Sequence, residues 1–141
     1  AYKEGKVRAI GLSNFTKEQI GEILSICEVK PTILQTEVHP YSQEPELKEF
    51  LKKEHMVIQA WYPLGHGDKA LLEEPVFAEL GKKYHKSSAQ VILRWHLQSG
   101  NVTGEEMERI QALNQNKRYY TSTPEMLKRY AEMVPPVDEQ K

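Results

Sequence analysis

The sequence predicts an α/β fold in which about three parallel strands alternate with helices. Two observations predict this class. Short apolar runs of strand length recur along the first half of the chain, and each is followed by a stretch whose apolar residues recur at helical spacing. Parallel strands joined by right-handed helical crossovers are the usual product of such alternation. The last third contains helical patterns only, so we expect extra helices there.

The composition is that of a single globular domain with 141 residues, of which 39% are hydrophobic. The formal net charge of -1 gives no electrostatic basis for binding nucleic acid or an anionic membrane surface. Cys27 is the single cysteine, so we expect a reducing, cytoplasmic setting without an intrachain disulfide. The charged opening residues are unlike a signal peptide, and no apolar run approaches the roughly 20 residues of a membrane span.

The first strand–helix unit ends its strand in a polar pair. The apolar run 7–12 is followed by Ser13 and Asn14, and Thr16 with Gln19 then has the spacing of a capping box at a helix start. Ligands of parallel α/β folds lie at the carboxyl ends of strands, so this pair marks a candidate site. A plain turn into the helix is the alternative interpretation, because serine and asparagine are turn residues.

Two further units repeat the pattern. We expect a strand at 33–38, a helix at 45–54 and a third strand at 56–62. Pro63 and the glycine-containing loop 64–68 end the third strand.

The remaining patterns predict helices and a frayed end. Capping-box spacings and apolar stripes predict helices over 75–85, 87–100, 103–113 and 122–134. No strand fits between Gly100 and Thr103. We therefore expect one domain over residues 1–134 and a frayed tail over residues 135–141.

Longer blocks of the sequence carry a family resemblance. They read GKVRAIGLSNF at 5–15, QTEVHPY at 35–41 and YPLG at 62–65, with support from AQVILRWHLQ at 89–98 and LNQNKRYY at 113–120. Together and in this order they resemble the carbonyl-reducing branch of the aldo-keto reductase family, over nearly the whole chain to Tyr120. The resemblance implies part of a (β/α)8 TIM barrel and a nicotinamide cofactor, usually NADPH, that reduces aldehydes and ketones to alcohols.

The resemblance also implies roles for the strand-end residues. Ser13, Asn14 and Gln35 would hydrogen-bond the nicotinamide carboxamide, a task that suits neutral amide and hydroxyl groups. Trp61 stands where the family usually has a tyrosine that stacks on the nicotinamide, and Tyr62 stands where a serine is more common. An indole stacks as well as a phenol, whereas the bulky Tyr62 ring sits where the pyrophosphate should approach.

Two loop residues complete the implied cofactor set. Leu64 and Gly65 match positions whose backbone would face the pyrophosphate. Without the resemblance, Trp61 would be interpreted as a core aromatic and Gly65 as a turn glycine.

Part of the family's chemistry has no counterpart here. The family uses a tyrosine acid with a lysine, an aspartate and a histidine from the first half of the barrel, and no segment matches that motif, so we assign no catalytic residue. The family's last strand and helix, which hold the adenosine phosphate, would fall between Gly100 and Thr103, so we expect weakened NADP binding. The five histidines lack the spacing of metal ligands, and no metal site is predicted.

Two functions follow from these expectations. The chain is either a truncated relative of NADPH-dependent reductases, inactive alone because its catalytic acid is missing, or a non-catalytic binding or scaffold protein that retains the fold. In the first case a small carbonyl compound is the substrate once the site is completed. Three strands cannot close a barrel, and a short parallel sheet is normally buried on both faces. We expect the open face to be covered by a complementary half, by a second copy in a homo-oligomer, or by the final helices.

Overall fold

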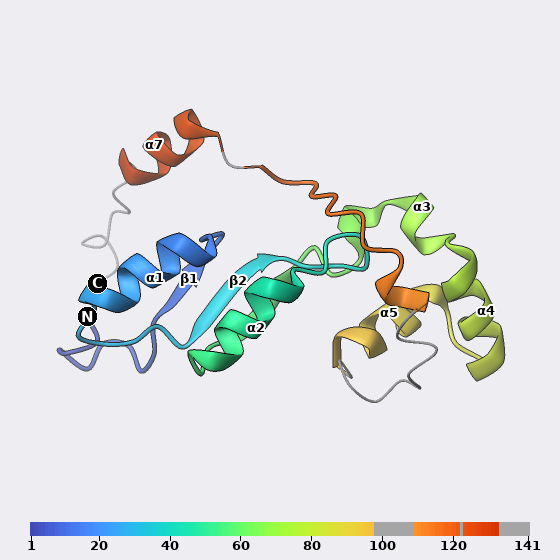
Figure 1. Ribbon diagram of the computed structural model, residues 1–141, viewed down its shortest axis with the longest axis horizontal. Helices are drawn as coiled ribbons and strands as arrows, with labels where there is room; N and C mark the ends of the chain where they lie inside the picture. Colours follow the sequence, from blue (N-terminus) through green and yellow to red (C-terminus); the bar gives the residue numbers. More distant parts are fainter. Residues whose placement is uncertain (98–108, 122, 133–141) are drawn as a thin grey trace, which may run out of the picture.

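The computed structural model describes residues 1–97, 109–121 and 123–132, and it has the predicted α/β architecture (Figure 1). Three parallel strands lie in the order β1-β2-β3. The strand–helix units are β1 (Gly11–Ser13), α1 (Lys17–Ile26), β2 (Ile33–Glu37), α2 (Pro45–Lys53) and β3 (Val57–Trp61). The later elements are η1 (Gly65–Gly67), α3 (Lys69–Leu72), α4 (Pro75–Tyr84), α5 (Ser88–Leu97) and α7 (Pro124–Glu132).

The sheet has two unlike faces, because successive side chains of a strand point to opposite sides. One face, which we call the helix-covered face, carries Leu34 and Thr36, both fully buried. Leu34 packs there in one cluster with Ile20 of α1 and Leu51 of α2. The helices α1 and α2 therefore cover this face, and their packing against it forms the first of two cores.

The opposite face, which we call the open face, carries the intervening residues. Gly11, Ser13, Val57 and Gln59 are exposed there, and the exposed fraction of Val57 reaches 61%. Gln35 is half-buried on the same face. The open face is therefore where the predicted cofactor residues of the strands lie.

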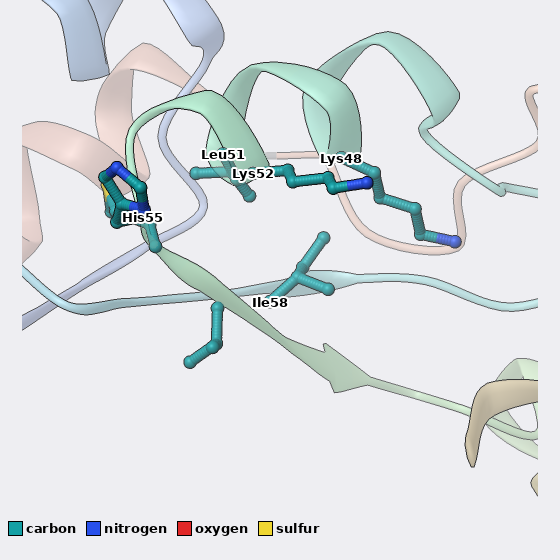
Figure 2. A pocket seen from close by; sticks show the side chains of 7 residues that line it. Lys48, Leu51, Lys52, His55 and Ile58 are labelled. Carbon is teal, nitrogen blue, oxygen red and sulfur yellow. The ribbon is translucent and has the colours of Figure 1, made fainter. Parts of the chain in front are cut away.

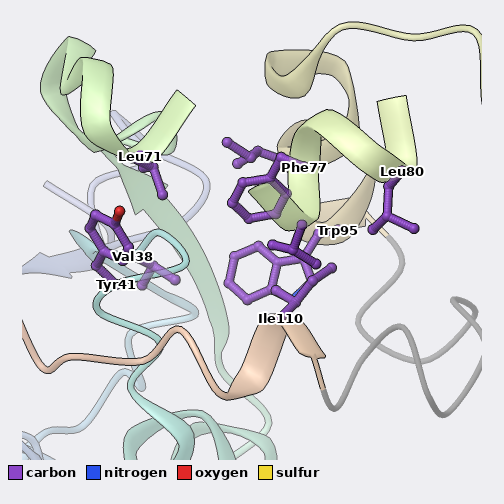
Figure 3. Packing of buried hydrophobic residues seen from close by; sticks show 9 residues of the cluster. Val38, Tyr41, Leu71, Phe77, Leu80, Trp95 and Ile110 are labelled. Carbon is purple, nitrogen blue, oxygen red and sulfur yellow. The ribbon is translucent and has the colours of Figure 1, made fainter. Parts of the chain in front are cut away.

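A second core lies beyond the carboxyl ends of β2 and β3. Phe77 of α4 and Trp95 of α5 pack there against Val38, Leu71 and Ile110 (Figure 3). Residues 109–111, which supply Ile110, are helical. This core fixes the loops that follow the strands, and those loops form one side of the candidate site.

The first strand is shorter than predicted. The run 7–12 was expected to be extended, but only Gly11–Ser13 pairs with β2. In the observed register Ala9 would lie opposite Pro31, which has no N–H to donate to the ladder. The prediction for 7–10 is wrong because the partner strand begins only at Ile33, two residues after that proline.

The helix starts are close to those predicted. Thr16 and Gln19 form the capping box of α1, with Thr16 N–H donating to Gln19 Oε1 over 2.9 Å. Ser87 N–H donates to Gln90 Oε1 over 3.0 Å at the start of α5. At α7 the cap is Thr123, whose Oγ1 accepts from Met126 N–H, and the helix begins at Pro124, two residues after the predicted start at 122.

Some predicted segments lie outside the described residues. These are the end of the helix expected to reach Gly100, most of the helix expected over 103–113 and the tail 135–141. In the described part of the chain, no helix has the length and apolar character needed to cross a membrane.

Candidate cofactor site

The carboxyl ends of β1 and β2 bring three predicted residues together. Ser13 is the register partner of Gln35, and the backbone N–H of Asn14 donates to the Gln35 carbonyl over 2.9 Å. Asn14 has a φ of 58°, in the left-handed region that asparagine tolerates better than most residues. This conformation turns the chain from β1 toward α1. Because Thr16 caps that helix, the side chains of Ser13 and Asn14 are not needed as caps.

The Asn14 side chain has an unsatisfied acceptor. Its Oδ1 is buried and has no hydrogen-bond partner in the described part of the chain. Asn14 lines a cavity of about 210 Å³ whose other walls include Thr36, Leu47 and Arg118. Among the described residues, two other buried polar atoms lack partners, in His39 and Trp95, but neither residue lines this cavity. A buried acceptor without a donor costs free energy, so a ligand N–H placed here would be stabilised.

This acceptor gives a test of whether the residues fit a nicotinamide. The carboxamide of that ring supplies both an N–H₂ donor for Asn14 Oδ1 and an oxygen that accepts from a hydroxyl or amide. Ser13 and Gln35 provide such donors at the same strand ends, although neither lines the cavity of Asn14. The residue types at the carboxyl ends of β1 and β2 therefore match the donors and acceptors of a carboxamide.

The carboxyl end of β3 fits it less well. The Trp61 indole stacks on the Tyr62 ring, with 3.7 Å between ring centroids and 19° between planes. Tyr62 in turn lies 4.2 Å from the His66 ring, and the edge of Tyr120 meets Trp61 at 89°. Tyr62 adopts a φ of 53°, a conformation uncommon for a bulky residue. The ring of Tyr62 thus covers one face of the Trp61 indole.

The loop after β3 is held tightly by its own contacts. Gly65 has a φ of 63°, and a Cβ at this position would lie 2.5 Å from Leu71 Cδ2. Its N–H donates to the Tyr62 carbonyl over 2.8 Å, and Leu64 packs against the second core. The glycine is therefore required by the turn and the close approach of Leu71, and its N–H is already paired.

Residues 118–120 form a feature that the sequence did not reveal. Glu37 is fully buried, and its carboxylate accepts the backbone N–H groups of Tyr119 and Tyr120 over 2.5 and 2.9 Å. His39 Nε2 lies 3.0 Å from the same carboxylate, and Arg118 Nη2 donates to Thr36 Oγ1 over 2.9 Å. Glu37 lies on the open face of β2, and this segment covers it. The sequence signal for this burial is the carboxylate of Glu37 inside an apolar strand, because a buried carboxylate needs hydrogen-bond partners.

The same region gathers a tyrosine, a lysine, an aspartate and a histidine. The Tyr119 hydroxyl donates to Asp68, Lys117 Nζ lies 3.1 Å from the same carboxylate, and the His39 ring lies 5.0 Å from the Tyr119 ring. Hydrogen bonds from Tyr119 and Lys117 lower the pKa of Asp68 to about 2. Burial and the bond to Asp68 raise the pKa of the Tyr119 phenol, which makes it a poor proton donor near neutrality. We therefore assign no catalytic acid.

The described residues hold no cluster of three His, Cys, Asp or Glu side chains able to bind a metal ion.

Solved structures identify the class of this fold. The chain superimposes on MGS-M4, an aldo-keto reductase from a Medee basin deep-sea metagenome library, with a TM-score of 0.80 and 26% identity. The superposition includes 85% of this chain and 53% of that one. The fold is thus part of an aldo-keto reductase TIM barrel.

The sequence comparison then gives the family. The profile of the Aldo/keto reductase family matches residues 1–134, and the chain belongs to this family. It is 39% identical to the 9,11-endoperoxide prostaglandin H2 reductase of Trypanosoma cruzi over 83% of this chain and 50% of the relative. It is 37% identical to the glyoxal reductase of Bacillus subtilis over 89% of this chain and 53% of the relative. The chain spans about half the length of the curated relatives it matches.

These alignments also contain positions without a counterpart here. The alignment with glyoxal reductase runs over 148 residues, more than the 141 of this whole chain, although it includes only 89% of the chain. The relative therefore carries residues inside the aligned stretch that this chain lacks.

Proposed function

We propose that this chain is the cofactor-binding part of a nicotinamide-dependent aldo-keto reductase, and that it reduces small aldehydes or ketones only when another polypeptide completes the site. The observation that carries the proposal is the buried, unpartnered Oδ1 of Asn14 beside Ser13 and Gln35. That acceptor and those two donors match the two ends of a carboxamide.

NADP is the cofactor we propose. Ser13, Asn14 and Gln35 would hold the carboxamide, and Trp61 would meet the ring after Tyr62 moves away. The bound cofactor supplies the hydride, and the strand-end residues fix the face of the ring that meets the substrate. We expect weak binding, because the family's adenosine-phosphate segment has no counterpart between Gly100 and Thr103.

The chain alone should not reduce carbonyl compounds. Reduction of a carbonyl needs a proton donor as well as a hydride. Tyr119 has the right chemical group, but its hydroxyl proton is held by Asp68 and its pKa is raised. A completing polypeptide would have to bring the acid, and a complementary half or a second copy would serve. We place this function in the cytoplasm, as the single cysteine suggests.

A non-catalytic binding or scaffold role is the second candidate. The stacked rings of Trp61 and Tyr62 and the paired N–H of Gly65 favour it, because both remove groups that a cofactor would use. Loss of cofactor binding would leave the fold intact, since neither group belongs to the helix-covered face.

Cofactor titration separates the two functions. We expect NADPH to bind saturably in calorimetry and to quench the fluorescence of Trp61, with no oxidation of NADPH when a generic aldehyde is added. Asn14→Gly should weaken binding roughly tenfold, the cost of about one hydrogen bond to a buried group. Glycine suits this test because it accepts the positive φ. Gln59→Ala, on the exposed part of the open face, is the matched control and should bind like the wild type.

Two outcomes would contradict the proposal. An absence of saturable binding would leave the scaffold role, and NADPH oxidation by the purified chain would show that an acid is present after all.

A further inference from the structure

A groove between α2 and β3 combines apolar walls with two amines. The cavity has a volume of about 340 Å³, within the range of small-molecule sites, and we call it the α2–β3 groove (Figure 2). Leu51, Met56 and Ile58 form its apolar walls, and Figure 2 shows the Ile58 side chain directed toward α2. Lys48 and Lys52 extend from successive turns of α2 in the same direction along the groove. The groove therefore has room for a short carbon chain beside two amines.

The amine of Lys48 is partly withdrawn from water and has no acidic partner. Lys48 is half-buried, and its Nζ lies 5.0 Å from the centroid of the Trp95 ring on α5. Within the described part of the chain it has no carboxylate at ion-pair distance. Lys53, on the same helix, is exposed and its Nζ lies 3.3 Å from a carboxylate oxygen of Glu49. The two lysines of one helix therefore differ in hydration and in pairing.

This placement changes the chemistry of Lys48. Burial lowers the pKa of its ammonium, against the opposing charge of Glu44. The face of Trp95 also attracts the ammonium, so the pKa falls less than burial alone would give. The neutral amine has the lone pair that attacks a carbonyl carbon. Lys48 therefore has more of its reactive form near neutrality than a fully hydrated lysine.

Lys52 places a hydrated cation beside this amine. Residues four apart on a helix are neighbours, so Lys48 and Lys52 share one face of α2. Lys52 is exposed, and no carboxylate of the described residues lines the groove or lies at ion-pair distance from it. A compound attached to Lys48 would therefore bring an anionic group to a cation that has no competing partner.

We propose that Lys48 forms an imine with small aldehydes that carry a carboxylate, and that Lys52 binds the carboxylate. The Nζ lone pair attacks the aldehyde carbon while the C=O electron pair moves to oxygen, and a proton passes from nitrogen to that oxygen to give a carbinolamine. Loss of water then leaves a C=N bond, so no oxidant or reductant is consumed. The modification needs neither NADPH nor another polypeptide, so it is independent of the proposed reduction.

Reductive trapping tests this site. The purified chain is treated with 4-oxobutanoate or with butanal, which has the same carbon chain without the carboxylate, and cyanoborohydride reduces the imine before peptide mass mapping. We expect Lys48 to carry more label than the exposed Lys82 and Lys86. The preference of Lys48 for 4-oxobutanoate over butanal should exceed the preference of Lys82 by about threefold to fivefold, as expected for one solvent-exposed ion pair.

Three variants assign the roles of the lysines. Lys48→Arg keeps the positive charge but forms no imine, so the first product to form should be lost from the intact-mass spectrum. Lys52→Gln should lower the preference of Lys48 for 4-oxobutanoate to that of Lys82. Lys53→Gln makes the same charge change one residue further, outside the groove, and should leave the preference unchanged. Label spread evenly over the lysines, equal preferences at Lys48 and Lys82, or a preference that survives Lys52→Gln would overturn the proposal.

Discussion

The two faces of the same three strands differ in what they do for the molecule. On the helix-covered face Leu34 is fully buried between α1 and α2, whereas its neighbour Gln35 on the open face is only half-buried. Because side chains alternate along a strand, a residue that stabilises the core and a residue that can contact a ligand are neighbours in the sequence. The helix-covered face buries the apolar side chains that stabilise the sheet, and the open face keeps the polar groups that a ligand would use.

The largest effect we expect comes from testing this separation at adjacent positions. Leu34→Ala should lower the free energy of unfolding by about 3 kcal/mol, because it leaves a cavity in a packed cluster. Gln35→Ala should change stability by less than about 0.5 kcal/mol, as substitutions outside the core do. Urea unfolding of both variants measures the difference.

Cofactor titration completes the test of this pair. Gln35→Ala should weaken NADPH binding while Leu34→Ala, at a temperature where it stays folded, should not. If the two variants lose equal stability, the open face is buried by something in solution, and the contrast between the faces disappears.

A smaller effect is expected where the open face is already occupied, at the ring stack of β3. Tyr62→Ser removes the ring that lies 3.7 Å from Trp61. Stacked aromatic pairs contribute about 0.5–1.5 kcal/mol, so we expect NADPH to bind roughly 2- to 10-fold more tightly to the variant. Calorimetry measures the change in affinity. The fluorescence of Trp61 should also report that its indole is more exposed to solvent.

Tyr62→Phe is the matched control, because it keeps the ring and loses only the hydroxyl. It should bind NADPH like the wild type. Tighter binding by both variants would assign the effect to the hydroxyl, and binding by neither variant nor the wild type would count against the cofactor proposal itself.

The sequence predicted what depends on local pattern and missed what depends on distant partners. Parallel strands bring their carboxyl ends to one edge, so the proximity of Ser13 and Gln35 followed from the alternation of strands and helices. The capping box of Thr16 and Gln19 needs only four consecutive residues, and it formed as predicted. Features that depend on residues close in the sequence could be predicted because few distant contacts compete with them.

Three other features depended on contacts that a local pattern does not contain. The predicted start of β1 was wrong because the neighbouring strand begins only at Ile33, after Pro31. The stack of Tyr62 on Trp61 required a left-handed backbone at a residue type that rarely adopts it. The burial of Glu37 required Tyr119, which lies 82 positions away along the chain.

The smallest expected effect is a pH dependence of the free energy of unfolding, at the place where residues 118–120 cover Glu37. Burial lowers the pKa of His39, against the opposing effect of its hydrogen bond to Glu37, and burial also lowers the pKa of His96, whose Nε2 donates to the Pro63 carbonyl over 3.0 Å. Above a pH of about 6.5, the pKa of an unfolded histidine, neither state binds these protons and the chain has its full stability. Below it the unfolded chain takes up protons that the folded chain refuses, so the free energy of unfolding falls.

Urea unfolding between pH 7.5 and 5.5 measures this slope. Asp68 does not contribute in that window, because its pKa of about 2 confines its effect to stronger acid. His39→Gln keeps an amide donor for Glu37 but cannot be protonated, so it should flatten the slope even if the variant is less stable at every pH. A slope unchanged in this variant would mean that His39 is protonated in the folded chain, and that the closure over Glu37 is looser than its hydrogen bonds indicate.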